Sequence, residues 1–375
     1  MLFLLLAGRG YMALGDFTYF FVAGSDFVNP AETPAPVWVQ NGQGYDGQFF
    51  YRYSLDPFDF SKTANGITVD LVPYRMQRIL YPVLCWLASF GGTPWMVPYA
   101  MILINILAFF GILYFINAFI KKMPQATALG YLPLFLCGLY MSLGRDLSEV
   151  TELFFFTGAL FFLFDKKYLL FSIFASLTLL TRETSLLALL PIVFFTVFGF
   201  YKDKSQFYKI AFLLIPFAVF AGWKLIIAAQ TGTEPGASGT GNLGLPVSGI
   251  INGFIGNLDI STTKNKLQLL FWLGYFSWQL ILTAFVIKTL LKSGHALKDH
   301  FFLALTGAWI CWFLFALFLS PAVYIDDWSF VRVFSLWNLI GFLILIFRNR
   351  PLPALFRYYS MLLVALTLVR LIIRP

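Results

Sequence analysis

Acidic and basic side chains gather in one short aromatic stretch, residues 44–57, just after the first apolar run of the chain. It holds Asp46, Arg52 and Asp56 among several phenylalanines and tyrosines. Ionisable groups at the edge of a membrane are costly to desolvate, so such a cluster marks a site. A carboxylate in this position can serve as a general base that deprotonates a hydroxyl group during group transfer.

Asp46 is the first candidate for that base. Phe49, Phe50 and Tyr53 follow it at spacings of three, four and seven, which predicts an amphipathic helix. We expect this helix to lie on the bilayer with its aromatic side chains toward lipid and Asp46 at its start. Desolvation would then raise the pKa of Asp46. The alternative is that Asp46 only caps the helix.

Two arginines three positions apart, Arg75 and Arg78, are expected to share one face of a helix. A guanidinium group donates two parallel hydrogen bonds to phosphate and can neutralise a phosphate leaving group as its charge develops. The alternative is a pair of interfacial anchors that bind the phosphates of ordinary membrane lipids.

Three later connections carry charges of both signs and are expected on the same outer face as the first loop. Their charged residues are Arg145, Asp146, Glu149 and Glu152, then Arg182 and Glu183, and finally Asp326, Asp327 and Arg332. A helix bundle would gather them into one polar cavity, although a structural ion-pair network would explain Glu149 and Glu152 as well. Asp326 and Asp327 are weak candidates for holding Mg²⁺ or Mn²⁺, the alternative being a solvated turn.

The composition places these residues in a membrane protein. Hydrophobic residues make up 59% of the 375 residues and charged residues 12%, with a mean hydropathy of +0.78. The net charge of +8 does not indicate nucleic-acid binding, because the basic residues lie mainly in short connections between apolar runs. Three unclustered cysteines argue against a disulfide framework or a zinc site.

The apolar runs predict an all-α polytopic membrane protein with about eleven transmembrane helices in a single domain, residues 1–375. The first run lacks the features of a cleavable signal peptide, so we expect it to be a span. We also expect a long first outer loop at 24–78, an interfacial or re-entrant helix at 79–90, and a flexible outer loop at 231–266. The predicted spans are 2–23, 95–120, 126–143, 149–164, 168–181, 184–200, 208–230, 267–291, 300–320, 328–347 and 354–373.

Charge asymmetry supports this topology. With a cytoplasmic N-terminus, the connections on the cytoplasmic side hold 13 Lys and Arg but only 3 Asp and Glu. The acidic connections then fall on the opposite face. We therefore expect the acidic connections, and any site that they form, on the outer face of the membrane.

Four motifs carry a resemblance to a known family: YDGQFFY (45–51) with LDP (55–57), YRMQRILYP (74–82), RDLSE (145–149) and LLTRET (179–184). With these motifs the chain resembles bacterial members of the GT-C superfamily of multi-pass glycosyltransferases, of the type that builds cell-surface glycopolymers. It is more distantly similar to the mannosyltransferases of GPI-anchor synthesis. The resemblance implies a GT-C-like bundle, a first-loop acid at the catalytic centre, and polyprenyl-phosphate-linked sugars as donors.

The resemblance implies a glycosyltransferase, inverting at the transferred sugar, that moves it from a polyprenyl-phosphate donor to a cell-envelope glycan or lipid acceptor. It also implies a bacterial inner-membrane protein whose site faces the periplasm or the exterior. Membrane lipids are further partners and nucleic acid is not. Asp46 is the expected catalytic residue, and the expected donor-binding residues are Arg52, Asp56, Arg75, Arg78, Arg145, Asp146, Glu149, Arg182, Glu183 and Arg332.

Two other classes of protein compete with the glycosyltransferase. A transporter or flippase of a lipid-linked saccharide should show internal repeats or charges at mid-span, where only Lys224 comes near. A non-catalytic assembly partner should tolerate Asp46→Asn.

Overall fold

The computed structural model describes residues 1–123, 129–200, 207–233, 241–258, 260–293, 299–325 and 327–373. These residues are mostly α-helical. Six segments among them are long and apolar enough to cross a membrane, which makes the chain a polytopic α-helical membrane protein. The six are α5 (Val97–Lys121), Glu183–Phe200 with α9 (Leu186–Phe200), α10 (Tyr208–Thr231), α12 (Thr263–Leu291), α13 (His300–Leu317) and α17 (Ala354–Ile373).

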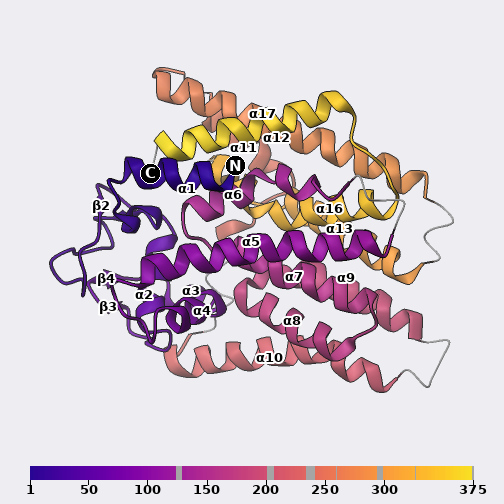
Figure 1. The fold of residues 1–375 in the computed structure, drawn as a ribbon, viewed down its shortest axis with the longest axis horizontal. Coiled ribbons are helices and arrows are strands. Elements are labelled where there is room, and N and C mark those ends of the chain that lie inside the picture. Colours follow the sequence, from indigo (N-terminus) through magenta and orange to yellow (C-terminus); the bar gives the residue numbers. More distant parts are fainter. Residues whose placement is uncertain are drawn as a thin grey trace.

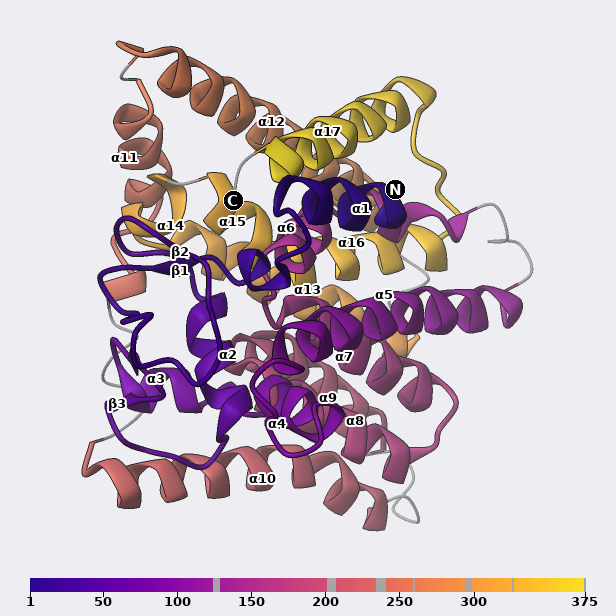
Figure 2. The ribbon, with the colours of Figure 1, turned by 60° about the vertical axis from the view of Figure 1, so that its left-hand side comes forward.

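Shorter helices complete the bundle. They are α1 (Leu2–Met12), α6 (Cys137–Gly144), α7 (Glu149–Phe164), α8 (Tyr168–Thr181), α11 (Ser248–Gly256), α14 (Pro321–Ile325), α15 (Asp327–Val333) and α16 (Ser335–Phe347). Among the described residues, the 3₁₀ turns η1 (Phe17–Phe20), η3 (Leu132–Phe135) and η4 (Glu183–Ser185) lie between helices. In Figures 1 and 2, α10 lies on one side of the bundle and α12 with α17 on the other, with α5, α7 and α8 between them.

Several predicted spans have wrong boundaries. The first helix ends at Met12 instead of residue 23, because Leu14 and Gly15 take positive φ values of 52° and 83° and break it. The prediction for 126–143 fails in a similar way, since only residues 137–144 form a helix after the 3₁₀ turn η3, and 124–128 lie outside the described residues. The span predicted at 328–347 is broken at Phe334 into α15 and α16.

Residues 23–78 form a compact cap over one end of the bundle, which we call the loop end. Its elements are β1 (Ala23–Gly24), β2 (Val39–Gln40), α2 (Gly47–Leu55), β3 (Thr63–Ala64), β4 (Ile67–Thr68) and α3 (Val72–Met76). Strands β1 and β2 are parallel, whereas β3 and β4 form an antiparallel hairpin. The hairpin turns at Asn65 and Gly66, both with positive φ, as a tight two-residue turn requires. Figure 1 shows the cap at the left of the bundle.

Helix α2 lies at the centre of this cap, and the prediction that it lies on the bilayer is wrong. All nine of its residues are buried, including Phe49, Phe50 and Tyr53. These side chains pack against the rest of the cap and against α4 (Leu80–Ala88). The aromatic content of α2 therefore forms a hydrophobic core for the loop instead of a lipid-facing surface.

Two other predicted segments contain regular structure. The segment predicted as interfacial, 79–90, holds α4, which packs on α2, α5 and α8. The segment predicted as a flexible loop, 231–266, contains α11, which packs on α14. Residues 234–240 and 259 of that segment lie outside the described residues.

Candidate functional site

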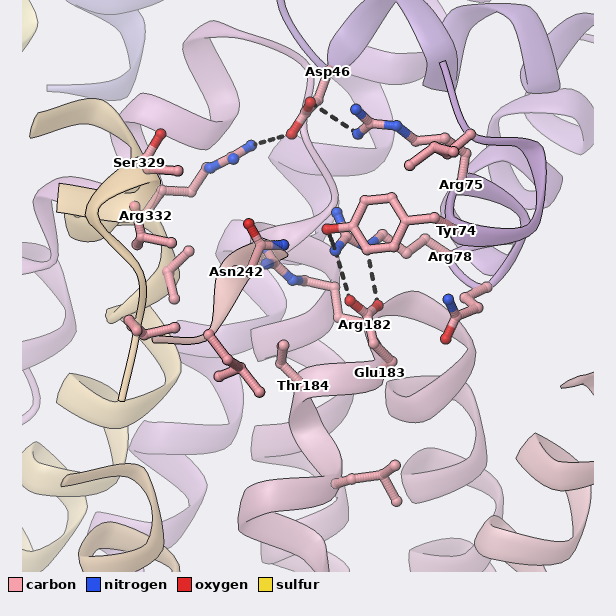
Figure 3. Close-up of a pocket in the computed structure, with 18 of the residues that line it drawn as sticks. Asp46, Tyr74, Arg75, Arg78, Arg182, Glu183, Thr184, Asn242, Ser329 and Arg332 are labelled. Atoms are coloured by element: carbon pink, nitrogen blue, oxygen red, sulfur yellow. Dashed lines mark hydrogen bonds and ion pairs between the residues drawn. The ribbon is translucent and has the colours of Figure 1, made fainter. Parts of the chain in front are cut away.

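A cavity of about 600 Å³ lies between the cap and the ends of the helices. Its polar wall comes from segments far apart in the sequence, which Figure 3 shows converging on one space. The charged residues of the wall are Asp46, Asp70, Arg75, Arg78, Arg182, Glu183, Lys224 and Arg332. Apolar side chains line the same cavity, namely Leu71, Leu186, Phe220, Leu243, Phe315, Leu319, Ala322, Val323 and Val333.

Asp46 is held at the edge of this cavity by the close approach of two backbones. A Cβ added at Gly47 would lie 2.5 Å from the carbonyl oxygen of Arg145 and 2.7 Å from that of Phe21. Only glycine allows the start of α2 to pack this tightly on the turn between α6 and α7. The backbone N–H of Tyr45 also donates to the carbonyl of Val22 at 2.8 Å. The position of Asp46 is therefore set by contacts on both sides of it.

The Asp46 carboxylate makes two ion pairs instead of capping α2. One oxygen accepts from Arg75 at 2.8 Å and the other from Arg332 at 2.9 Å, and no side-chain cap bond forms. Burial by itself would raise the pKa of Asp46, but Arg75, Arg332 and the more distant Arg78 hold it well below its usual range. The expectation of a raised pKa is therefore wrong, because neighbouring cations outweigh desolvation.

Arg75 is fixed from three directions. Asp70 accepts two hydrogen bonds from it, at 2.9 and 2.7 Å, and its guanidinium lies 4.5 Å from the ring centroid of Phe49. The carboxylate of Asp46 is its third contact. Asp70 was among the acidic residues of the first loop, but nothing in its sequence context marked it as part of the site.

Arg78 joins the cap to the bundle. Its guanidinium donates to both oxygens of Glu183, at 3.0 and 2.6 Å, and to the hydroxyl of Tyr74 at 2.6 Å. Arg78 and Glu183 are 105 residues apart in the sequence and both line the cavity, so their pair joins the cap to η4 at the cavity wall (Figure 3). Both residues were predicted site residues, but the sequence did not show that they pair.

A second layer of ion pairs lies behind the cavity wall. Glu149 pairs with Arg182 and with Arg332, the latter at 3.2 Å, and Glu152 lies 3.6 Å from Arg182. Glu149 does not line the cavity, and its partners do. Its geometry matches the alternative of a structural ion-pair network, which orients the two arginines.

The remaining predicted site residues lie away from the cavity. Arg52 is buried inside the cap and donates to Asp59 and to the carbonyl of Ser61. Asp56 is exposed and accepts from the backbone of Phe58. Both side chains therefore bond to neighbouring segments of the cap, and neither lines the cavity.

Two predicted residues of the α6–α7 turn are buried behind the site. The guanidinium of Arg145 lies between the rings of Tyr45 and Trp328, 4.3 Å from each centroid. Asp146 is fully buried with a φ of 48°, and burial raises the pKa of its carboxyl well above the usual range.

The metal prediction is not supported by a described cluster. Asp326 and the side chain of Asp327 lie outside the described residues. In the part of the chain that the structure describes, no group of three or more His, Cys, Asp or Glu residues is arranged to hold a metal ion.

Sequence reasoning missed several residues of the wall. Tyr74, Asn242 and Ser329 supply neutral polar groups, and Lys224 supplies a cation from within α10. For Lys224 the signal was present, since it is a charge near mid-span, where a charge is expensive without a function.

Comparisons of this chain with models of protein families, with curated proteins and with solved structures find no match. The geometry of the cavity therefore carries the functional argument.

Proposed function

We propose that this chain is a membrane glycosyltransferase of the GT-C type. It would move a sugar from a polyprenyl-phosphate-linked donor to a cell-envelope glycan or lipid acceptor. The observation that carries the proposal is a cavity in which one carboxylate is set among guanidinium groups and which apolar side chains also line. Such a mixed lining suits a ligand with an anionic head and a hydrocarbon tail.

The proposed topology has eleven crossings in a bacterial inner membrane, with the loop end facing the periplasm or the exterior. The basic connections favour this orientation, because Lys121, Lys122, Lys166 and Lys167 lie at the helix ends away from the cap. Helices α7, α8 and α16 are short for full crossings, so they would span with help from the turns that flank them.

The proposed reaction is a direct displacement at the anomeric carbon. The acceptor hydroxyl gives its proton to Asp46 as its oxygen attacks, the bond between the anomeric carbon and the phosphate oxygen breaks, and polyprenyl phosphate leaves. The leaving phosphate gains negative charge, which Arg75, Arg78 and Arg332 would stabilise. The configuration at the anomeric carbon inverts.

Asp46 is a weak base while two arginines contact it, because its pKa is held well below the usual range. In the proposed sequence, the donor phosphate takes hydrogen bonds from Arg75 and Arg332 and so frees the carboxylate. Its pKa then rises, as desolvation favours, and proton transfer from the acceptor becomes easier. Binding of the donor would thus activate the base.

The test uses purified protein in lipid nanodiscs with a panel of radiolabelled polyprenyl-phosphate sugars and native membrane acceptors. Asp46→Asn is compared with Asp56→Asn, a carboxylate of the same loop that is exposed and off the cavity. We expect donor consumption to fall at least a hundredfold in Asp46→Asn, a typical contribution of a general base, and to persist in Asp56→Asn. Each reaction is repeated with EDTA to decide whether Mg²⁺ or Mn²⁺ is required.

Unchanged turnover in Asp46→Asn would refute its catalytic role. Transbilayer movement of a labelled lipid-linked saccharide without any sugar transfer would favour a flippase instead.

A further inference from the structure

Lys224 differs from every other cation of the cavity wall. The other cations are four arginines, each of which forms a salt bridge with at least one carboxylate. They are Arg75, Arg78, Arg182 and Arg332. Lys224 lines the same cavity and makes no salt bridge to any described carboxylate. Its ammonium lies 5.9 Å from the ring centroid of Phe220, one turn away on the same helix.

The arginines of the cavity wall already have carboxylate partners, which affects where an anionic ligand can bind. The four arginines pair with five carboxylates, namely Asp46, Asp70, Glu149, Glu152 and Glu183. An anionic ligand that approached the arginines would have to break an existing ion pair. Lys224 can bind an anion without that cost, so it is the cation to which an incoming anion would attach first.

The helix face that Lys224 occupies is fixed by its neighbour. The indole N–H of Trp223 donates to the carbonyl of Met76 in α3 at 2.8 Å, and the rings of Phe58 and Phe60 pack near it. These contacts set the rotation and depth of α10 against the cap. Lys224 is consequently presented to the cavity by a rigid element.

The depth of Lys224 in α10 points to an amphiphilic ligand. It lies seven residues before the end of the helix at Thr231, or about 10 Å along the axis. A cation at that depth is expensive unless a partner compensates it, and such residues mark substrate pathways. Phe220 lies a further turn into the span, and Phe315 and Leu319 line the same cavity.

We propose that Lys224 anchors the phosphate group of an isoprenoid phosphate, with its hydrocarbon chain along Phe220, Phe315 and Leu319. The choice of an isoprenoid rests on the proposed function. The phosphate site itself rests on a cation that has no carboxylate partner among the described residues, on the cavity, and on the apolar side chains that line it.

A binding assay tests this without any turnover. Tritiated farnesyl phosphate is titrated onto the protein in phosphatidylcholine nanodiscs, with farnesol, inorganic phosphate and phosphatidic acid as competitors. Lys224→Met is compared with Lys224→Arg, which keeps the charge, and with Lys209→Met, which removes a lysine at the opposite end of α10. Melting temperatures of the variants show whether each one is folded.

We expect Lys224→Met to weaken farnesyl phosphate binding about tenfold or more, the usual contribution of a charged hydrogen bond. Lys224→Arg and Lys209→Met should bind within about threefold of the parent, and farnesol and inorganic phosphate should compete poorly, because each lacks one half of the ligand. Binding by a folded Lys224→Met at parental affinity, or no binding by the parent, would overturn the proposal. Equal competition by phosphatidic acid would overturn the isoprenoid assignment in favour of an ordinary lipid anchor, and equal competition by inorganic phosphate would overturn the lipid part.

The outcome separates this proposal from the proposed function. Lys224-dependent binding without sugar transfer from any donor would leave the phosphate site standing and the transferase in doubt. Sugar transfer with an unchanged donor KM in Lys224→Met would do the reverse.

Discussion

The ion pair between Arg78 and Glu183 offers a sharp test of how the cap is attached to the bundle. Their side chains are 5% and 19% exposed, and two hydrogen bonds join them. Removing one member of a buried pair leaves the other charge uncompensated, at a cost of about 3–5 kcal/mol. Because Glu183 borders the cavity, we expect the low end of that range, about 3 kcal/mol, for either Arg78→Met or Glu183→Gln.

The double variant should be much less damaged than the sum of the two. With about 3 kcal/mol for each single change, additivity predicts about 6 kcal/mol, whereas loss of both charges together should cost about 3–4 kcal/mol. The coupling energy is then about 2–3 kcal/mol. Reversible unfolding in mixed micelles of increasing SDS content, followed by tryptophan fluorescence, measures all four proteins.

A pair with an exposed lysine, whose carboxylate also pairs with Lys122, provides the control. Lys167 and Asp165 lie 3.1 Å apart at the end of α7, with Lys167 56% exposed, so their coupling should fall within about 0–1 kcal/mol. Additivity within about 0.5 kcal/mol for Arg78 and Glu183 would refute the inferred clamp between the cap and the α8–α9 turn.

Two further predictions concern Asp46. The pKa of Asp46 in the folded protein lies below its usual value, so the stability from its ion pairs is present above about pH 4 and is lost as the pH falls below it. The destabilisation caused by Asp46→Asn in thermal unfolding should therefore shrink between pH 7 and pH 3. A difference that stays constant with pH would contradict the ion pairing. Gly47→Ala should displace Asp46 and cut donor turnover at least tenfold, because the added Cβ would meet backbone 2.5 Å away, whereas Gly222→Ala, with nothing within 4 Å, should leave turnover unchanged. Equal turnover in the two alanine variants would refute the role given to Gly47.

Apolar run length predicted the helices well where packing did not compete with it. The predictions for 208–230 and 354–373 match α10 and α17 closely, since long uninterrupted apolar runs form helices whatever surrounds them. The first span failed because Leu14 and Gly15 take positive φ values that end the helix, and Asp16 then accepts the backbone N–H of Thr18 to start η1. The length of an apolar run does not show where such local breaks in a helix fall.

The aromatic helix after Asp46 shows a different limit. Its spacing of Phe49, Phe50 and Tyr53 correctly predicted a helix, but the same pattern serves a lipid surface and a protein core equally well. Which one applies depends on whether other chain segments cover the helix. The rest of the cap covers it together with α4 and α5, and only tertiary packing contains that information.

The sequence by itself determined the membrane class and the acidic first loop. It also identified six charged residues of the cavity, because desolvation makes a charge beside an apolar run costly and therefore rare without a function. These residues are Asp46, Arg75, Arg78, Arg182, Glu183 and Arg332. Tertiary structure alone decided their partners. Electrostatic energy depends on distances of a few ångströms, and those between Asp46 and Arg332 arise from segments nearly three hundred residues apart. It also decided that the pKa of Asp46 falls instead of rising, and that Lys224 meets the same cavity without a carboxylate partner among the described residues.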